Sequence, residues 1–245
     1  MLKIKMNKFD IRIIFLFFFT LDVLSENIGQ PGELFPIKVN KGIFTSSNGL
    51  IKIDNSYYKL VPLSFSKQGQ YVMFEDTKIF IQNKDFGESR ITITNNALVN
   101  LSDEDKDRTI RESKIINKAL QTYSKKMKPT FSFISPVDGI ISSRYGKKRF
   151  INNSPRSPHL ALDIAAPEGT KVLSPEDGKV ILIGNFFYSG NYLIIDHGQG
   201  LLSSYSHLSS ISVSEDDILK QGQEIGKVGS TGRVTGPHLH WTVYY

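Results

Sequence analysis

Residues 236–241 read GPHLHW and place two histidines, His238 and His240, one residue apart. The chain of 245 residues has five histidines, so a pair this close calls for an explanation. In a β-strand, side chains at positions i and i+2 point the same way, and Leu239 would point to the opposite face. Two imidazoles directed at one point suit metal binding, proton transfer or both. The alternative is a pair of surface histidines on an edge strand, because an H-x-H pattern alone is a weak signal.

The sequence around this pair, from Phe131 onward, consists of short strand-like runs separated by glycine-containing turns, such as KVLSPEDGKVILIG, NYLIIDHGQG, LLSSYSHL and LHWTVYY. Short strands with a turn about every 8–12 residues predict an antiparallel β fold, either a sandwich or a folded-over sheet. The uninterrupted apolar run Leu193, Ile194 and Ile195 predicts a central strand.

The first part of the chain is predicted to contain a second, smaller β domain over residues 26–101. Its runs, such as IKIDNSYYKLVPLSF and RITITNN, alternate β-branched and aromatic residues with polar ones, with Asn-Gly and Asp-Asn pairs between them. Residues 102–128 change to a helical pattern, in which Ser102 can cap, acidic residues follow, and basic residues gather at the end. We therefore predict a mainly β protein with a small antiparallel β domain, a linking helix and a C-terminal antiparallel β-sheet domain over 129–245.

Residues 1–25 have the layout of a secretory signal peptide. Four basic residues precede the apolar run IIFLFFFTL at positions 13–21, and Val23 and Ser25 stand at −3 and −1 of a cleavage site before Glu26. The apolar run is shorter than the roughly 20 residues that a membrane span needs. We therefore expect an exported protein with no stable membrane span after cleavage, and the alternative is an uncleaved anchor.

The composition excludes several kinds of site. The chain has no cysteine, which excludes disulfides, a thiolate zinc site and a cysteine nucleophile, so any metal must be held by histidine and carboxylate. The net charge of +6 favours encounter with polyanionic surfaces such as bacterial wall polymers. No run of basic residues interleaved with aromatic ones indicates a nucleic-acid groove, and we expect no nucleic-acid partner.

The other three histidines lie in separate segments. His159 precedes Asp163 by four residues in SPHLALD, and on a straight strand these residues would lie about 13 Å apart. Both can bind one ion only if the segment turns. His207 lies in YSHL, before a polar loop. His197 follows the predicted central strand, where we expect a structural histidine hydrogen-bonded to nearby backbone.

Chemistry gives a reason to assemble such groups. A catalytic zinc keeps three protein ligands and one open position for water. Two neutral imidazoles and one carboxylate leave a net positive site, which acidifies the bound water. Two further histidines can then move protons and stabilise an anionic transition state.

The order HLALD, YSHL and GSTGRVTGPHLHW resembles the lysostaphin-type zinc metallopeptidases, which are the LytM-domain endopeptidases of bacterial cell walls. The resemblance covers about residues 131–245. It departs from the family at Ala161, where glycine is common, and at Tyr245, where family members usually continue with another strand or loop. The resemblance implies one Zn²⁺ per chain, bound by His159, Asp163 and His240. It implies that His207 and His238 are the catalytic histidines and that His197 is not a ligand.

The resemblance implies a zinc metalloendopeptidase that hydrolyses peptide cross-links of bacterial peptidoglycan, in the periplasm or outside the cell. One alternative is a non-catalytic LytM-like regulator, which binds cell wall or activates another hydrolase. Another is a carrier domain, because GTKVLSPEDGKVILIG is similar to biotinyl and lipoyl carriers. Such a carrier needs a lysine at a hairpin tip, whereas Lys179 lies within a strand-like run.

The predicted N-terminal domain is a candidate regulator of the enzyme. A polar side chain from residues 30–100, such as a loop asparagine, could occupy the open position of the zinc and displace its water. The alternative is that this domain binds wall or partners.

Overall fold

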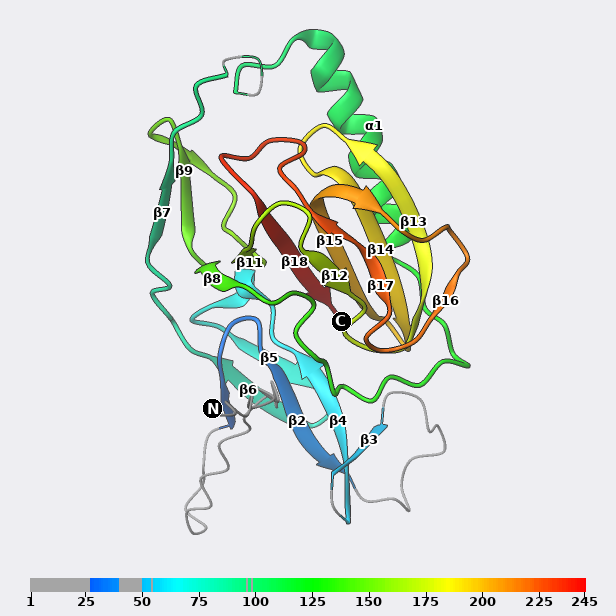
Figure 1. Cartoon of the computed structure of the whole chain (residues 1–245). Helices are drawn as coiled ribbons and strands as arrows, with labels where there is room; N and C mark the ends of the chain where they lie inside the picture. The colour runs from blue at the N-terminus through cyan, green and yellow to red at the C-terminus, as the bar shows by residue number, and fades with distance from the viewer. Residues whose placement is uncertain (1–26, 40–49, 54, 96, 98) are drawn as a thin grey trace, which may run out of the picture.

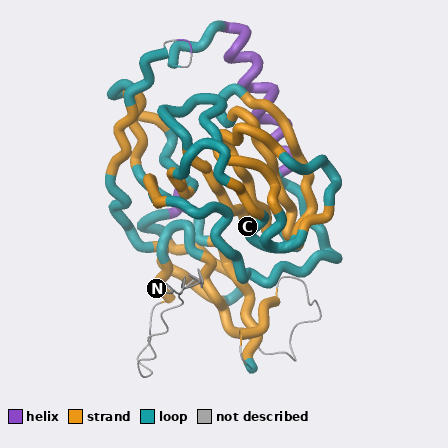
Figure 2. The backbone as a smooth tube through the Cα atoms, in the orientation of Figure 1, coloured by secondary structure: helices purple, strands orange, loops and turns teal. Residues whose placement is uncertain are grey.

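The computed structural model describes residues 27–39, 50–53, 55–95, 97 and 99–245. The predicted signal peptide lies outside these residues. Strands dominate the described part of the chain, which contains one α-helix, so the prediction of a mainly β protein is confirmed (Figures 1 and 2). Within the described residues, no helix combines the length and the apolar character that crossing a membrane requires.

The largest sheet holds nine strands and occupies the C-terminal half of the chain. Seven of them follow one another in space in the order β16-β13-β14-β15-β18-β11-β8, and every pair among them is antiparallel. Two more, β12 and β17, pair with each other, and β17 also pairs with β15. The strands are β8 (Ile140–Ser143), β11 (Leu162–Ala165), β12 (Lys171–Leu173), β13 (Gly178–Phe186), β14 (Gly190–Gly198), β15 (Leu201–Ile211), β16 (Ile218–Leu219), β17 (Glu224–Val228) and β18 (His238–Tyr244).

The predicted central strand is confirmed as β14, which lies between β13 and β15 with Leu193, Ile194 and Ile195 fully buried. Leu193 and Ile195 face one apolar cluster, and Ile194 faces another, because side chains alternate along a strand. Strands β12 and β17 cover the first cluster with Val172 and Ile225. The sequence predicted either a sandwich or a folded-over sheet. Since β12 and β17 belong to the same sheet as the strands they cover, the observed fold is the folded-over sheet.

The helix α1 (Asp103–Ala119) forms within the segment predicted to be helical and ends before residue 128. Its N-cap is Ser102, whose hydroxyl oxygen accepts a hydrogen bond from the backbone N–H of Asp105 at 3.1 Å. Asp103, Glu104 and Asp105 fill the first turn, where their charges suit the helix dipole. The local signals of the sequence therefore placed the start of the helix correctly.

The helix α1 covers the second apolar cluster of the large sheet (Figure 1). Ile116 and Leu120 pack there against Phe186, Tyr192, Ile194 and Leu202. The Glu112 carboxylate accepts hydrogen bonds from Nε of Arg108 (2.6 Å) and from the backbone N–H of Phe187 (2.8 Å). These contacts fix α1 on the sheet, so it does more than link two parts of the chain.

The N-terminal half forms small sheets that include parallel pairs. Strands β2 (Leu34–Val39), β4 (Ser56–Pro62) and β3 (Leu50–Ile53) are antiparallel, as are β5 (Tyr71–Phe74) and β6 (Thr77–Ile81). However, β1 (Asn27–Gly29) pairs with β6 in parallel, and β7 (Glu88–Ile91) pairs in parallel with β9 (Lys148–Ile151), which continues to β10 (Ser154–Arg156). A strand from the segment 26–101 is thus joined to a hairpin of the C-terminal segment. The alternation of side chains predicts a strand but carries no information on its partner.

His197, in β14, takes part in a buried hydrogen-bond chain. Its Nδ1 donates to the backbone oxygen of Asp177 at 2.8 Å, as predicted for a structural histidine, and its Nε2 contacts the Ser203 hydroxyl at 2.7 Å. Ser203 also contacts the Tyr205 hydroxyl at 2.7 Å. Burial lowers the pKa of His197, although the hydrogen bond to Asp177 acts in the opposite direction. His197 is therefore a neutral, buried group of the core.

The packing of α1 gives the first prediction. Ile116→Ala removes apolar contacts with the second cluster and should lower the free energy of unfolding by about 1–2 kcal/mol, less than for a fully buried isoleucine. The control is Ile115→Ala, since Ile115 is 49% exposed and should change that free energy by less than about 0.5 kcal/mol. Urea denaturation followed by circular dichroism measures both. Equal effects of the two substitutions would mean that α1 is not packed on the sheet in solution.

The burial of His197 gives the second prediction, on pH. A histidine whose pKa is lowered in the folded state binds its proton more readily when unfolded, so stability is lost as pH falls through the unfolded pKa of about 6.5. Between pH 7 and 5.5 His197 should therefore contribute to that loss. His197→Gln should therefore show a shallower decline than the parent chain in urea titrations over this range. Parallel stability–pH curves would contradict the prediction.

Candidate metal centre

The pairing of β18 with β11 brings His240 opposite Asp163. His238 is opposite Ala165 in the same ladder, and it shares a face of β18 with His240. Leu239 points to the other face and is fully buried in the first apolar cluster, as the H-x-H pattern predicts. One face of β18 therefore packs in the core, and the other face carries both imidazoles.

The segment that contains His159 turns before β11 begins. As a result Nε2 of His159 lies 2.9 Å from Oδ1 of Asp163, instead of the long separation expected along a straight strand. Nδ1 of His240 lies 2.7 Å from the same oxygen and 3.3 Å from Nε2 of His159. One ligand atom from each of these three side chains thus lies within 4.8 Å of the others. Ala161, between the two ligands of the first motif, has no left-handed backbone conformation, so glycine is not required there.

The hydrogen bonds around His159 make this group suitable for a cation. Nδ1 of His159 lies 3.2 Å from the carbonyl oxygen of Arg144, which can only accept, so a proton on Nδ1 is donated to that oxygen. A proton on Nε2 forms the hydrogen bond to Asp163, whereas a ring with its proton on Nδ1 would offer the Nε2 lone pair to a cation. A cation at the point where these atoms converge would bind all of them, and the backbone oxygen of Arg144 would orient the ring.

The remaining two histidines lie beside this group. The ring centre of His207 is 4.9 Å from that of His238 and 5.7 Å from that of His240. Nδ1 of His238 lies 2.9 Å from the backbone oxygen of Gly236, and Nδ1 of His207 lies 2.9 Å from that of Thr231. A proton on Nδ1 of either ring is therefore donated to a backbone oxygen, and the neutral form of such a ring has none on Nε2.

His207 is held in an uncommon backbone conformation. Its φ is +66°, in the left-handed region that costs a non-glycine residue about 1–3 kcal/mol. It lies where the register between β14 and β15 shifts, and its backbone N–H donates to the oxygen of Ser189 at 2.8 Å. The neighbouring Gly190 leaves room for Thr231, since a Cβ there would lie 2.3 Å from the Thr231 hydroxyl oxygen. The strand irregularity thus directs the ring of His207 to the site.

Burial and mutual charge set the protonation of the group. Burial alone would raise the pKa of Asp163, but the hydrogen bonds with His159 and His240 outweigh it and hold that pKa well below its usual range. Burial, together with the nearby His240 and His238, lowers the pKa of His207 to about 3. Burial also lowers the pKa of His240, against the effect of Asp163. At neutral pH the site therefore offers a carboxylate and neutral His207 and His240 rings.

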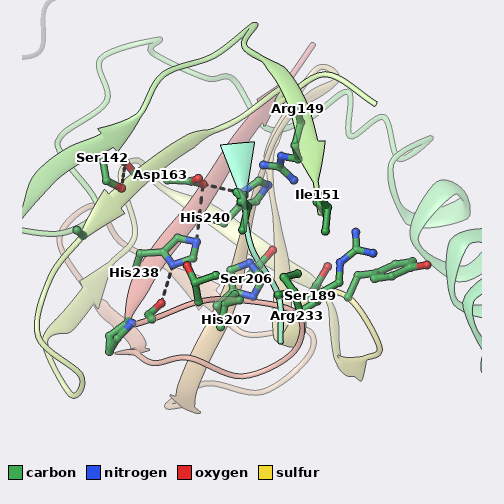
Figure 3. A pocket seen from close by; sticks show the side chains of 18 residues that line it. Ser142, Arg149, Ile151, Asp163, Ser189, Ser206, His207, Arg233, His238 and His240 are labelled. Carbon is green, nitrogen blue, oxygen red and sulfur yellow. Dashed lines mark hydrogen bonds and ion pairs between the residues drawn. The ribbon is translucent and has the colours of Figure 1, made fainter. Parts of the chain in front are cut away.

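Four of the five groups line a cavity of about 400 Å³, which is open to solvent (Figure 3). Asp163, His207, His238 and His240 line it, whereas His159 is buried behind them. His197 does not line the cavity and does not belong to the group of potential ligands in the described residues. The structure thus brings together the five predicted side chains and leaves the sixth candidate in the core.

The cavity wall also contains residues that the sequence analysis did not single out. Arg149 and Ile151 of β9 contribute to one side, and Arg233 comes from the loop before β18 (Figure 3). In the described part of the chain before α1, only Ile91 and Ile93 line the cavity. No local pattern marks these residues. Arg233 lies inside the quoted GSTGRVTGPHLHW motif, which is the only signal that could have indicated it.

Comparison with known proteins supports the resemblance. Residues 157–245, which contain all five site residues, match peptidase family M23. A crystal structure from Pseudomonas aeruginosa assigned to peptidase M23 aligns over 90% of this chain and 91% of its own, with a TM-score of 0.65 and 29% identity.

Two curated relatives come from Vibrio cholerae serotype O1. The peptidoglycan DD-endopeptidase ShyA is 44% identical over 109 residues, which are 43% of this chain and 25% of ShyA. The peptidoglycan DD-endopeptidase ShyB is 46% identical over 86 residues, which are 35% of this chain and 20% of ShyB. The chain spans a quarter or less of the length of these relatives. Taken with the motifs and the geometry of the site, these matches show that residues 157–245 form a domain of peptidase family M23.

Proposed function

We propose that the chain is a zinc metalloendopeptidase that hydrolyses peptide cross-links of bacterial peptidoglycan. The observation that carries the proposal is the convergence of His159, Asp163 and His240 beside an open cavity, with two further histidines next to them. The relatives named as peptidoglycan DD-endopeptidases support peptidoglycan peptides as the substrate. The net charge of +6 suits an anionic wall, and the layout of residues 1–25 supports export to the periplasm or beyond the cell.

The donor set favours zinc as the metal, one ion per chain. Two imidazole nitrogens and one carboxylate oxygen form a common ligand set for catalytic Zn²⁺, and the absence of cysteine leaves no softer ligand. When bound, the ion supplies Lewis acidity, which polarises a peptide carbonyl and lowers the pKa of water. The carbonyl of Arg144 holds the ring of His159 in the tautomer that this role requires.

His207 and His238 are proposed as the catalytic histidines. Each neutral ring that donates an Nδ1 proton to its backbone oxygen keeps Nε2 unprotonated, and both rings line the cavity. Each Nε2 can therefore accept a proton from the attacking water and return it to the leaving amine. The low pKa of His207, due to burial, keeps its ring neutral at neutral pH.

The third prediction separates metal ligands from proton-transfer groups. Asp163→Ala and His240→Ala should each lose bound zinc and activity, because each removes one of three protein ligands. His207→Ala and His238→Ala should retain zinc and lose roughly 10²–10⁴-fold in turnover. Elemental analysis and cleavage of purified peptidoglycan measure the two effects.

The same experiment distinguishes the non-catalytic alternative. A parent chain that binds zinc but releases no fragments from peptidoglycan would favour a regulator that binds wall or activates another hydrolase. Bound zinc in His240→Ala together with zinc loss in His238→Ala would reverse the roles proposed for the pair.

The fourth prediction concerns regulation by the N-terminal part of the chain, which stays a proposal. Its described residues contribute apolar Ile91 and Ile93 to the cavity wall, and not the asparagine expected from the sequence. If this wall restricts entry, Ile91→Ala should raise turnover of a small soluble peptide a few-fold, and exposed Thr92→Ala should not. Equal or lower turnover for Ile91→Ala would contradict occlusion. Deleting residues 1–127 is a poorer test, because it also removes α1 and β7 from the sheets that they complete.

A further inference from the structure

Arg149 lies on the cavity wall next to the metal ligands. It shares a face of β9 with Ile151, and this face is directed at the cavity (Figure 3). Its Nε atom is buried and has no hydrogen-bond partner among the described residues. Arg149 interacts electrostatically with both Asp163 and His240, so its guanidinium group lies close to the proposed reaction centre. A buried guanidinium N–H without an acceptor is costly unless a ligand provides one.

Arg233 lies on the same side of the cavity as Arg149, away from Ser142 and His238 (Figure 3). Its guanidinium carbon lies 4.0 Å from the centre of the Tyr188 ring, and its backbone N–H donates to the oxygen of Tyr188 at 3.0 Å. The stacking and a side-chain hydrogen bond with Tyr188 hold the guanidinium group at the cavity wall.

The positive charge of these two arginines is only partly balanced, by the attraction between Asp163 and Arg149. Neither of them forms an ion pair with any residue that the structure describes. Asp163 is the only acidic residue of the cavity lining, and it is already engaged by His159 and His240. Burial lowers the pKa of both arginines, against the effect of Asp163 on Arg149 and of Tyr188 on Arg233. Repulsion by Arg156 and Arg149 lowers the pKa of Arg233 further. The arrangement therefore suits an anion supplied from outside the chain.

We propose that Arg149 and Arg233 form a subsite for a free carboxylate group of the substrate, next to the bond that is cut. This proposal rests on the proposed function and specifies its substrate class. A guanidinium group binds a carboxylate through parallel, charge-assisted hydrogen bonds. The substrate would be a cross-link in which the scissile amide nitrogen belongs to a diamino acid with a free carboxylate. A glycine bridge has no such group within the chain, and a substrate with that carboxylate amidated would lose the interaction.

The test compares two synthetic cross-linked peptides that differ only at this group, one with the free carboxylate and one with the carboxamide. A charge-assisted hydrogen bond is worth enough to give the zinc-loaded parent chain a preference of about 10–100-fold in kcat/KM for the carboxylate. Arg233→Gln and Arg149→Gln should each reduce this preference at least several-fold, and Arg149→Lys should retain more of it than Arg149→Gln. Zinc content, measured on each variant, should stay at the parent level, which excludes an effect through loss of the ion.

Arg156→Gln is the matched control. Arg156 is exposed on β10, lies near enough to repel Arg233, and does not line the cavity. The substitution removes one positive charge but no proposed contact with the substrate, so the preference for the carboxylate peptide should persist. If Arg149→Gln does not fold, as judged by circular dichroism, Arg233→Gln decides the outcome.

The possible failures are distinguishable. Equal cleavage of both peptides by the parent chain, or an unchanged preference in Arg233→Gln, would overturn the carboxylate subsite and leave the endopeptidase proposal standing. An equal loss of preference in Arg156→Gln would also overturn it, because general positive charge would then explain the selectivity. Cleavage of neither peptide nor of peptidoglycan would instead overturn the proposed function.

Discussion

The antiparallel pairing of β11 with β18 is the constraint on which the site depends. It fixes Asp163 opposite His240, so that two side chains 77 residues apart in the chain meet at 2.7 Å. The same strand buries Leu239 on its other face, which prevents a slip by one residue, because such a slip would bring the histidines into the core. The hydrophobic core thus specifies the position of the proposed metal ligands.

The polar groups of the site are buried in a way that determines their charge. A neutral ring is cheaper to bury than a charged one, and this lowers the pKa of His207 and of His240. Asp163 shows the opposite balance, since its hydrogen bonds with two histidines outweigh the effect of burial. Each imidazole with a proton on Nδ1 gives it to a backbone oxygen, from Arg144, Thr231 or Gly236, so the backbone selects the tautomer. Positions in the fold therefore set the chemistry that each histidine can perform.

The N-terminal half contributes to the site indirectly. Strand β7 pairs with β9, whose inner face includes Arg149, and α1 packs on the face of the large sheet that carries Tyr244, which is also the face of His238 and His240. The cavity wall is therefore built from segments that precede α1 in the sequence and segments that follow it. The Nε atom of the Arg149 guanidinium group is buried on this wall. The free-energy cost of burying it is offset if a ligand accepts its hydrogen bond.

The sequence by itself determined the β character of the chain, the central strand, the start of the helix and the spacing of the five site residues. These features depend on local patterns, such as the uninterrupted apolar run Leu193–Ile195, the capping by Ser102 and the i, i+2 spacing of His238 and His240. Only the tertiary structure decided that β7 pairs in parallel with β9, that α1 packs on the sheet, and that Arg149 and Arg233 share one wall of the cavity. These features depend on which distant segments come into contact. Strand pairing and burial are set by the whole chain, so no local pattern encodes them.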